Sequence, residues 1–168
     1  SLMTVEPLGL KQVQELLDPG TSLLEYFITD NEIFAWVVER EKLQFQRIGL
    51  RKEKLSGLVK TLRESIFTLG ERDKFNEATG VLYQQLIEPL LPHITGKELV
   101  IVPHDVLHNL PFHALVGPDG RYLIELTGVA RFRIEEELEV ATAYRQCRVT
   151  FAPFADDFVA RKGEEAVD

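Results

Sequence analysis

Apolar residues recur at helical spacing near the start of the chain. Leu10, Val13, Leu16 and Leu17 lie three or four positions apart, which predicts a short amphipathic helix. The Asp-Pro-Gly sequence at residues 18–20 predicts that this helix ends there, because proline and glycine disfavour its continuation.

The next segment changes to the pattern of β-strands. Residues 22–29 and 33–38 are dense in β-branched and aromatic types, and residues 43–46 alternate apolar with polar side chains. Short polar connections at 30–31 and 39–42 separate the three runs. Connections of this length predict an antiparallel meander of three strands.

Two longer helical patterns follow the predicted meander. Each has apolar residues at intervals of three and four positions, so we expect each helix to bury one face. The first stripe consists of Leu55, Leu58, Val59, Leu62, Ile66 and Leu69. The second consists of Phe75, Ala78, Leu82, Leu86 and Leu90.

A continuous apolar run then predicts a buried strand. Residues 97–102 (KELVIV) lie between Gly96 and Pro103, and such a run is typical of a strand covered on both faces. We also expect a short strand at 121–125 and a helix at 133–147. The order of elements predicts an α/β fold with a mixed sheet and helices packed on it.

Composition narrows the class of protein. The 168 residues, 45% of them hydrophobic, suit a single domain over 1–168 with its own core. The net charge of −8 argues against a nucleic-acid partner, and no apolar run approaches the roughly 20 residues of a membrane span. The lone cysteine, Cys147, excludes an internal disulfide, so we expect a cytoplasmic protein.

Candidate chemistry concentrates directly after the predicted buried strand. His104, Asp105, His108 and His113 lie within ten residues, at the strand end where open α/β sheets bind ligands. These four residues form a candidate binding loop for a small ligand or a metal ion. However, Pro111 interrupts the spacing, and the pattern matches no known zinc site. We therefore favour a packing role with His108 in the core, and we assign no metal ligand and no cofactor.

Cys147 and His108 are the weak candidates for catalysis. Arg145 and Arg148 flank the cysteine and would favour its thiolate form. Against catalysis, Cys147 is predicted near the end of a helix rather than in a loop, and a lone cysteine is commonly an inert apolar residue. The chain also lacks the common nucleophile, phosphate-loop and metalloprotease motifs. We therefore favour a non-enzyme.

Three segments, in this order, resemble the N-terminal part of a CHAT domain, the caspase- and separase-like domain often found after tetratricopeptide repeats. They are QELLDPGTSLLEYFITDNEIFAWVV, LYQQLIEPLLPHITGKELVIVPHDVLHNLPFHAL and PDGRYLIE. We assign residues 10–125 as the CHAT-like region and 126–168 as a divergent C-terminal segment.

The resemblance implies a caspase-like first half and, in the family, a Cys–His peptidase dyad. The family places that dyad further along, after an apolar run that ends in His-Gly and another that ends in a small residue and Cys. This chain has no histidine after His113, and Cys147 lacks the family's surrounding pattern. His108 matches the family's Leu-His-x-Leu-Pro-Phe position, which we interpret as structural.

The leading hypothesis is a truncated or degenerate CHAT-like domain, non-catalytic as it stands, that acts as a regulatory or protein-interaction module. Its partner would be a protein, either a second copy of the chain or a tetratricopeptide-repeat region, and we expect self-association. One alternative is an active CHAT-family cysteine peptidase with a dyad of Cys147 and His104, His108 or His113. The other is a small-ligand or metal-binding domain that uses the 104–113 loop.

Overall fold

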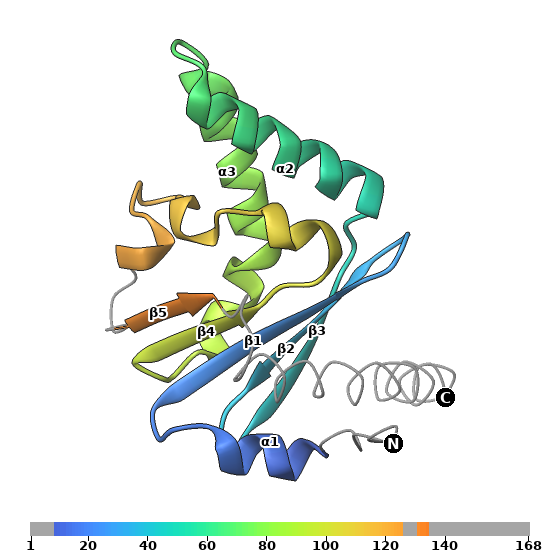
Figure 1. Cartoon of the computed structure of the whole chain (residues 1–168), viewed down its shortest axis with the longest axis vertical. Helices are drawn as coiled ribbons and strands as arrows, with labels where there is room; N and C mark the ends of the chain where they lie inside the picture. Colours follow the sequence, from blue (N-terminus) through green and yellow to red (C-terminus); the bar gives the residue numbers. More distant parts are fainter. Residues whose placement is uncertain (1–8, 126–130, 135–168) are drawn as a thin grey trace, which may run out of the picture.

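The computed structural model describes residues 9–125 and 131–134 and has a mixed α/β architecture, as predicted (Figure 1). Five strands form one sheet in the order β3-β2-β1-β4-β5. The strands are β1 (Thr21–Ile28), β2 (Ile33–Val38), β3 (Leu43–Ile48), β4 (Glu98–Val102) and β5 (Arg131–Ile134). The helices are α1 (Leu10–Leu16), α2 (Lys52–Phe67) and α3 (Arg72–Leu86).

The predicted meander is confirmed. β1 pairs antiparallel with β2, and β2 pairs antiparallel with β3, so that Trp36 lies between Glu25 and Phe45 across the three strands. The Thr29 amide donates to the Glu32 carbonyl over 2.9 Å and closes the turn between β1 and β2. These short turns are what place the first three strands in chain order.

β4 confirms the prediction of a buried strand. It pairs parallel with β1 on one side and with β5 on the other. Leu99 and Ile101 pack into the core cluster that contains α2 and α3, whereas Val100 and Val102 pack into the cluster that contains α1. Since both faces of β4 are covered, its apolar residues run without alternation.

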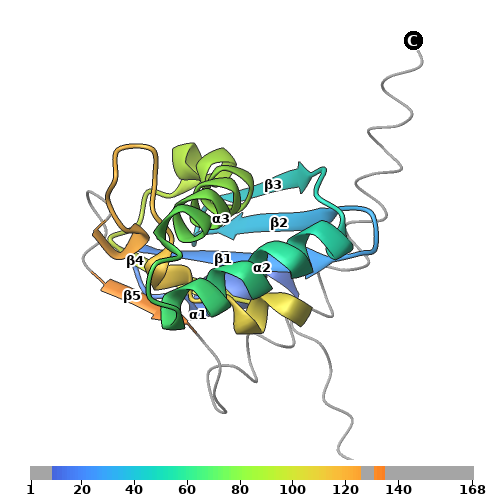
Figure 2. The same ribbon diagram turned by 90° about the horizontal axis from the view of Figure 1, so that it is seen from above.

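β1 also has side chains on both faces of the sheet. Leu23 belongs to the cluster that contains α1. Leu24, Tyr26 and Ile28 belong to the core cluster under α2 and α3, which lie next to each other alongside the strands (Figure 2). The Tyr26 hydroxyl donates to the Leu86 carbonyl over 2.8 Å, and its ring stacks on Phe112. Complete burial raises the pKa of Tyr26 far above its ordinary value, so this hydroxyl remains a donor.

The apolar stripe of α2 is buried along only part of its length. Leu55 and Leu62 are fully buried, and Val59 nearly so. The prediction is wrong for Ile66, which is 44% exposed, and for Leu69, which is fully exposed. The reason is that the end of α2 and the turn into α3 extend beyond the sheet (Figure 1), where none of the described strands faces them.

The predicted strand at 121–125 is also wrong. Tyr122 forms an isolated antiparallel bridge with Val116, and Leu123–Glu125 is a 3-10 helix. The Glu125 carboxylate accepts a hydrogen bond from the Tyr122 amide over 2.9 Å, which favours this tight turn over an extended strand.

The helix predicted at 133–147 is wrong at its start, because residues 133 and 134 belong to β5. Pairing with β4 gives their backbone groups hydrogen-bond partners in the sheet. The remainder of that prediction lies outside the described residues. Among the described helices, none has the length and apolarity needed to cross a bilayer.

Candidate functional site

The candidate binding loop follows β4 and folds into two short 3-10 helices, Asp105–Asn109 and Phe112–Ala114. Pro111 separates them, since its ring disfavours helical geometry in the preceding residue. Leu107 and Phe112 are fully buried, and Leu110 nearly so. These apolar side chains anchor the loop on the side of the sheet that α2 and α3 cover.

His104 is held at the ends of β1 and β4. Its Nδ1 accepts a hydrogen bond from the Ile28 amide over 2.9 Å, and its ring stacks on Phe27 with 4.7 Å between the ring centroids. An accepting Nδ1 places the proton of the neutral ring on Nε2. His104 therefore joins the loop to β1 through one ring nitrogen.

Asp105 ties the loop to the start of α2. Its Oδ2 accepts from Lys52 Nζ over 2.9 Å, and its Oδ1 accepts from the Val106 amide over 2.7 Å. The hydrogen bond from Lys52 holds the pKa of Asp105 below its ordinary value. Asp105 also has a left-handed backbone, with φ of 53°, which is uncommon outside glycine. Both carboxylate oxygens are thus used to fix the loop.

The prediction that His108 fills a core position is wrong, because this side chain is exposed. Residues three apart share a face of a 3-10 helix. Leu107 and Leu110 have that spacing, and both are buried. They take the inward positions, which leaves His108 on the outer surface.

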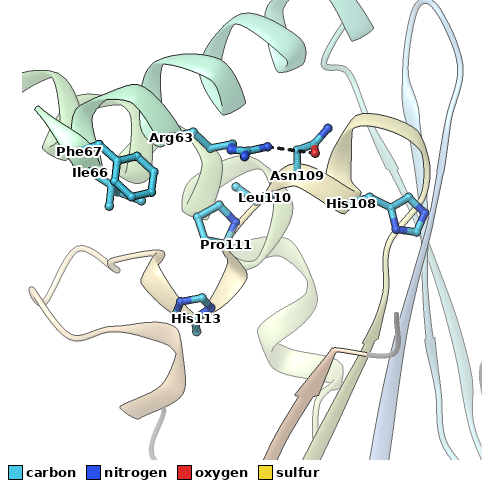
Figure 3. Close-up of a pocket in the computed structure, with 8 residues that line it drawn as sticks. All are labelled: Arg63, Ile66, Phe67, His108, Asn109, Leu110, Pro111 and His113. Atoms are coloured by element: carbon cyan, nitrogen blue, oxygen red, sulfur yellow. Dashed lines mark hydrogen bonds between the residues drawn. The ribbon is translucent and has the colours of Figure 1, made fainter. Parts of the chain in front are cut away.

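The structure divides the four predicted binding residues among three places. His104 contacts β1 and Asp105 contacts Lys52, whereas His108 and His113 line a surface groove together with Pro111 (Figure 3). In the part of the chain that the structure describes, no group of three His, Cys, Asp or Glu side chains has the arrangement needed to hold a metal ion.

This groove, called the α2 groove below, runs between the last turn of α2 and the loop. Its volume is about 440 Å³. Arg63 Nη1 donates to Asn109 Oδ1 over 3.0 Å and joins the two walls. The lining residues are Arg63, Ile66, Phe67, His108, Asn109, Leu110, Pro111 and His113.

Sequence reasoning missed the wall of the α2 groove that α2 provides. Ile66 follows the helical stripe and looked like core, whereas Phe67 lies off the stripe and is 85% exposed. An aromatic residue on the polar side of an amphipathic helix is the signal that could have identified this wall. Cys147, the candidate nucleophile, lies outside the described residues.

The loop after β4 lies in a part of the chain that matches a known protein family. The family model described as the CHAT domain matches residues 76–149. Residues 76–149 are therefore similar in sequence to CHAT domains. The match begins within α3, later than the expected start at residue 10, and it continues beyond Glu125. Among curated proteins, none matches the chain.

The α2 groove lies at a border of the CHAT match. His108, Pro111 and His113 lie within the residues that match the CHAT model, whereas Arg63 and Phe67 precede them. The matched segment thus supplies one wall of the groove, and the helix before it supplies the other.

Proposed function

We propose that this CHAT-domain chain binds protein without cleaving it and acts as an interaction or regulatory module. The observation that carries the proposal is the α2 groove, which presents the highly exposed Phe67 beside Ile66. Contiguous exposed apolar side chains are typical of surfaces that bind another protein.

The positions of the loop histidines support binding over catalysis. A cysteine peptidase needs an imidazole base held by an orienting group within hydrogen-bond reach of the thiol. His104 uses Nδ1 to accept from the Ile28 amide. Asp105, the carboxylate of the same loop, accepts from Lys52 and Val106. His108 and His113 lie on an open surface groove.

The competing function is cysteine peptidase activity, which the CHAT match favours because a Cys–His dyad is what resemblance to that family implies. The two functions are separated with a panel of fluorogenic peptides, assayed with the wild-type chain, the chain after thiol alkylation, and Cys147→Ser. We expect no difference in peptide hydrolysis among the three. Hydrolysis that disappears on alkylation and in Cys147→Ser would refute the proposal and establish the peptidase.

A further inference from the structure

The α2 groove adjoins a second hollow at the turn between α2 and α3. Ile66 and His113 line both hollows, so the two lie next to each other on one surface. The second hollow has a volume of about 450 Å³ and adds Leu69, Arg72 and Tyr122 to the lining. The two adjoining hollows are together called the furrow below.

The apolar side chains of this furrow are unusually exposed. Phe67 is 85% exposed, Leu69 is fully exposed, and Ile66 and Tyr122 are each 44% exposed. Large apolar side chains of a soluble domain are more often scattered singly over the surface. Their concentration around one furrow indicates a surface on which a partner packs apolar residues.

The charge of the furrow identifies the kind of partner. Arg63 and His113 line the first hollow and Arg72 the second, and among the described residues neither hollow is lined by Asp or Glu. The chain as a whole has 27 acidic and only 19 basic residues. A basic lining in an acidic chain favours a segment that carries negative charge.

The acidic residues next to Arg63 and Arg72 in sequence have lysine partners. Glu64 forms an ion pair with Lys60, and Glu71 forms one with Lys74. Arg63 uses Nη1 for Asn109, and its guanidinium has further N–H donors whose fork geometry suits a carboxylate.

We infer that the furrow binds a protein segment in which a Glu or Asp lies beside Leu or Phe. Apolar side chains of the segment pack on Phe67 and Pro111, and its carboxylate accepts hydrogen bonds from Arg63. This inference rests on the proposed function, because it names the partner of the same surface. A nucleic acid is disfavoured because the net charge of −8 repels a polyanion.

The test uses three short fluorescein-labelled peptides with Leu and Phe at the same positions and Glu, Gln or Lys at the others. Binding to the full chain is measured by fluorescence anisotropy. We expect the Glu peptide to bind about tenfold more tightly than the Lys peptide, with the Gln peptide between them, and the difference to shrink as salt rises.

Matched variants locate the binding surface. Phe67→Ser and Arg63→Gln should each weaken binding of the Glu peptide by about fivefold or more. Leu16→Ser changes another apolar side chain, 56% exposed on α1, and Lys54→Gln changes an exposed cation at the other end of α2, so both should leave binding unchanged. If Phe67→Ser does not fold, Leu69→Ser is used in its place.

Three results would overturn the inference. They are equal binding of the three peptides, unchanged binding by Phe67→Ser and Arg63→Gln, and concentration-dependent self-association that Phe67→Ser abolishes without any preference for the Glu peptide. Mass spectrometry of the peptide recovered from the binding assay shows whether the peptide was cleaved. This distinguishes a failure of the present inference from a failure of the proposed function. Cys147-dependent cleavage would refute non-catalytic binding even if the preference for Glu held.

Discussion

The two ends of the sheet use their polar side chains in opposite ways. At the start of β1 and β4, Ser22, Glu39, Thr95 and Gly96 form a closed hydrogen-bonded group, called the Glu39 cluster below. The Glu39 carboxylate accepts from the Ser22 hydroxyl, from the Thr95 amide over 2.9 Å and from the Thr95 hydroxyl over 2.8 Å. The Gly96 amide in turn donates to Ser22 Oγ over 2.8 Å.

At the opposite end of the sheet, the second half of the loop after β4 buries Leu107 and Leu110 and leaves His108 and His113 on the surface. His108 and His113 are exposed in the α2 groove, together with Phe67. The comparison indicates that the Glu39 cluster stabilises the fold by pairing its polar groups with one another, whereas the α2 groove leaves His108, His113 and Phe67 exposed.

The largest expected effect compares two leucines of the same apolar stripe. Leu62→Ala should lower the free energy of unfolding by about 2–5 kcal/mol, because Leu62 is fully buried and its removal leaves a cavity. Leu69→Ala should change it by less than about 0.5 kcal/mol, because Leu69 is fully exposed. Urea denaturation checks both, and similar losses would show that the end of α2 is covered after all.

Gly96 tests how tightly the Glu39 cluster is closed. A Cβ at this position would lie 2.5 Å from the Gly20 carbonyl oxygen and 2.6 Å from the Ser22 nitrogen, and neither backbone atom can move without disturbing β1. We expect Gly96→Ala to cost about 2–3 kcal/mol. The control Gly80→Ala, in α3 with nothing within 4 Å of a Cβ, should stabilise by about 0.5–1 kcal/mol. Losses in both variants would contradict the account.

Glu39 should make stability depend on pH. Partial burial alone would raise its pKa, but hydrogen bonds from Ser22 and Thr95 outweigh this effect and lower the pKa below 4.5. A carboxyl whose pKa is lower in the folded state stabilises the protein above its unfolded pKa, and this stabilisation is lost as pH falls through the folded pKa.

Glu39→Gln should therefore cost about 1 kcal/mol at pH 7, a value already reduced for solvent screening. The difference from wild type should shrink below the ordinary pKa of 4.5. Denaturation midpoints measured from pH 7 to acid pH check this, and a difference independent of pH would exclude the Glu39 carboxylate as its source.

The smallest expected effect concerns the ion pair between Lys52 and Asp105. Both side chains are more than a third exposed, so solvent weakens their attraction. Asp105→Asn keeps a residue type that tolerates the left-handed backbone, and we expect no resolvable shift of the unfolding midpoint. A shift as large as that of Glu39→Gln would remove the contrast between the two ends of the sheet.

Local pattern predicted β1, β2, β3 and β4 but missed β5, whose residues were in part assigned to a helix. The LVIV run identified β4 because burial on both faces leaves no room for polar residues, and the short turns identified the meander. The end of α2 could not be predicted in this way. A helical stripe reports which residues share a face, but not where the layer beneath that face stops.

The Glu39 cluster and the positions of the loop histidines could not be predicted from local pattern, because both depend on how distant or neighbouring segments fold. Ser22 and Gly96 of the Glu39 cluster are 74 positions apart in sequence, so only the parallel pairing of β1 and β4 brings them together. The prediction placed His108 in the core, which is wrong because the 3-10 geometry of its segment decides which residues turn inward. The cluster of three histidines was visible in sequence, but the separation of His104, which contacts β1, from His108 and His113, which line the α2 groove, was not.

The most direct test of the central claim is a nuclear magnetic resonance titration of the isotope-labelled full chain with the Glu peptide described above. The account predicts amide shift changes in residues 63–69 and 108–115, unchanged amides in residues 20–22 and 95–98, and a peptide that is recovered intact. Shift changes centred on the Glu39 cluster, or cleavage of the peptide during the titration, would contradict the claim that the open end of the sheet binds a partner without cleaving it.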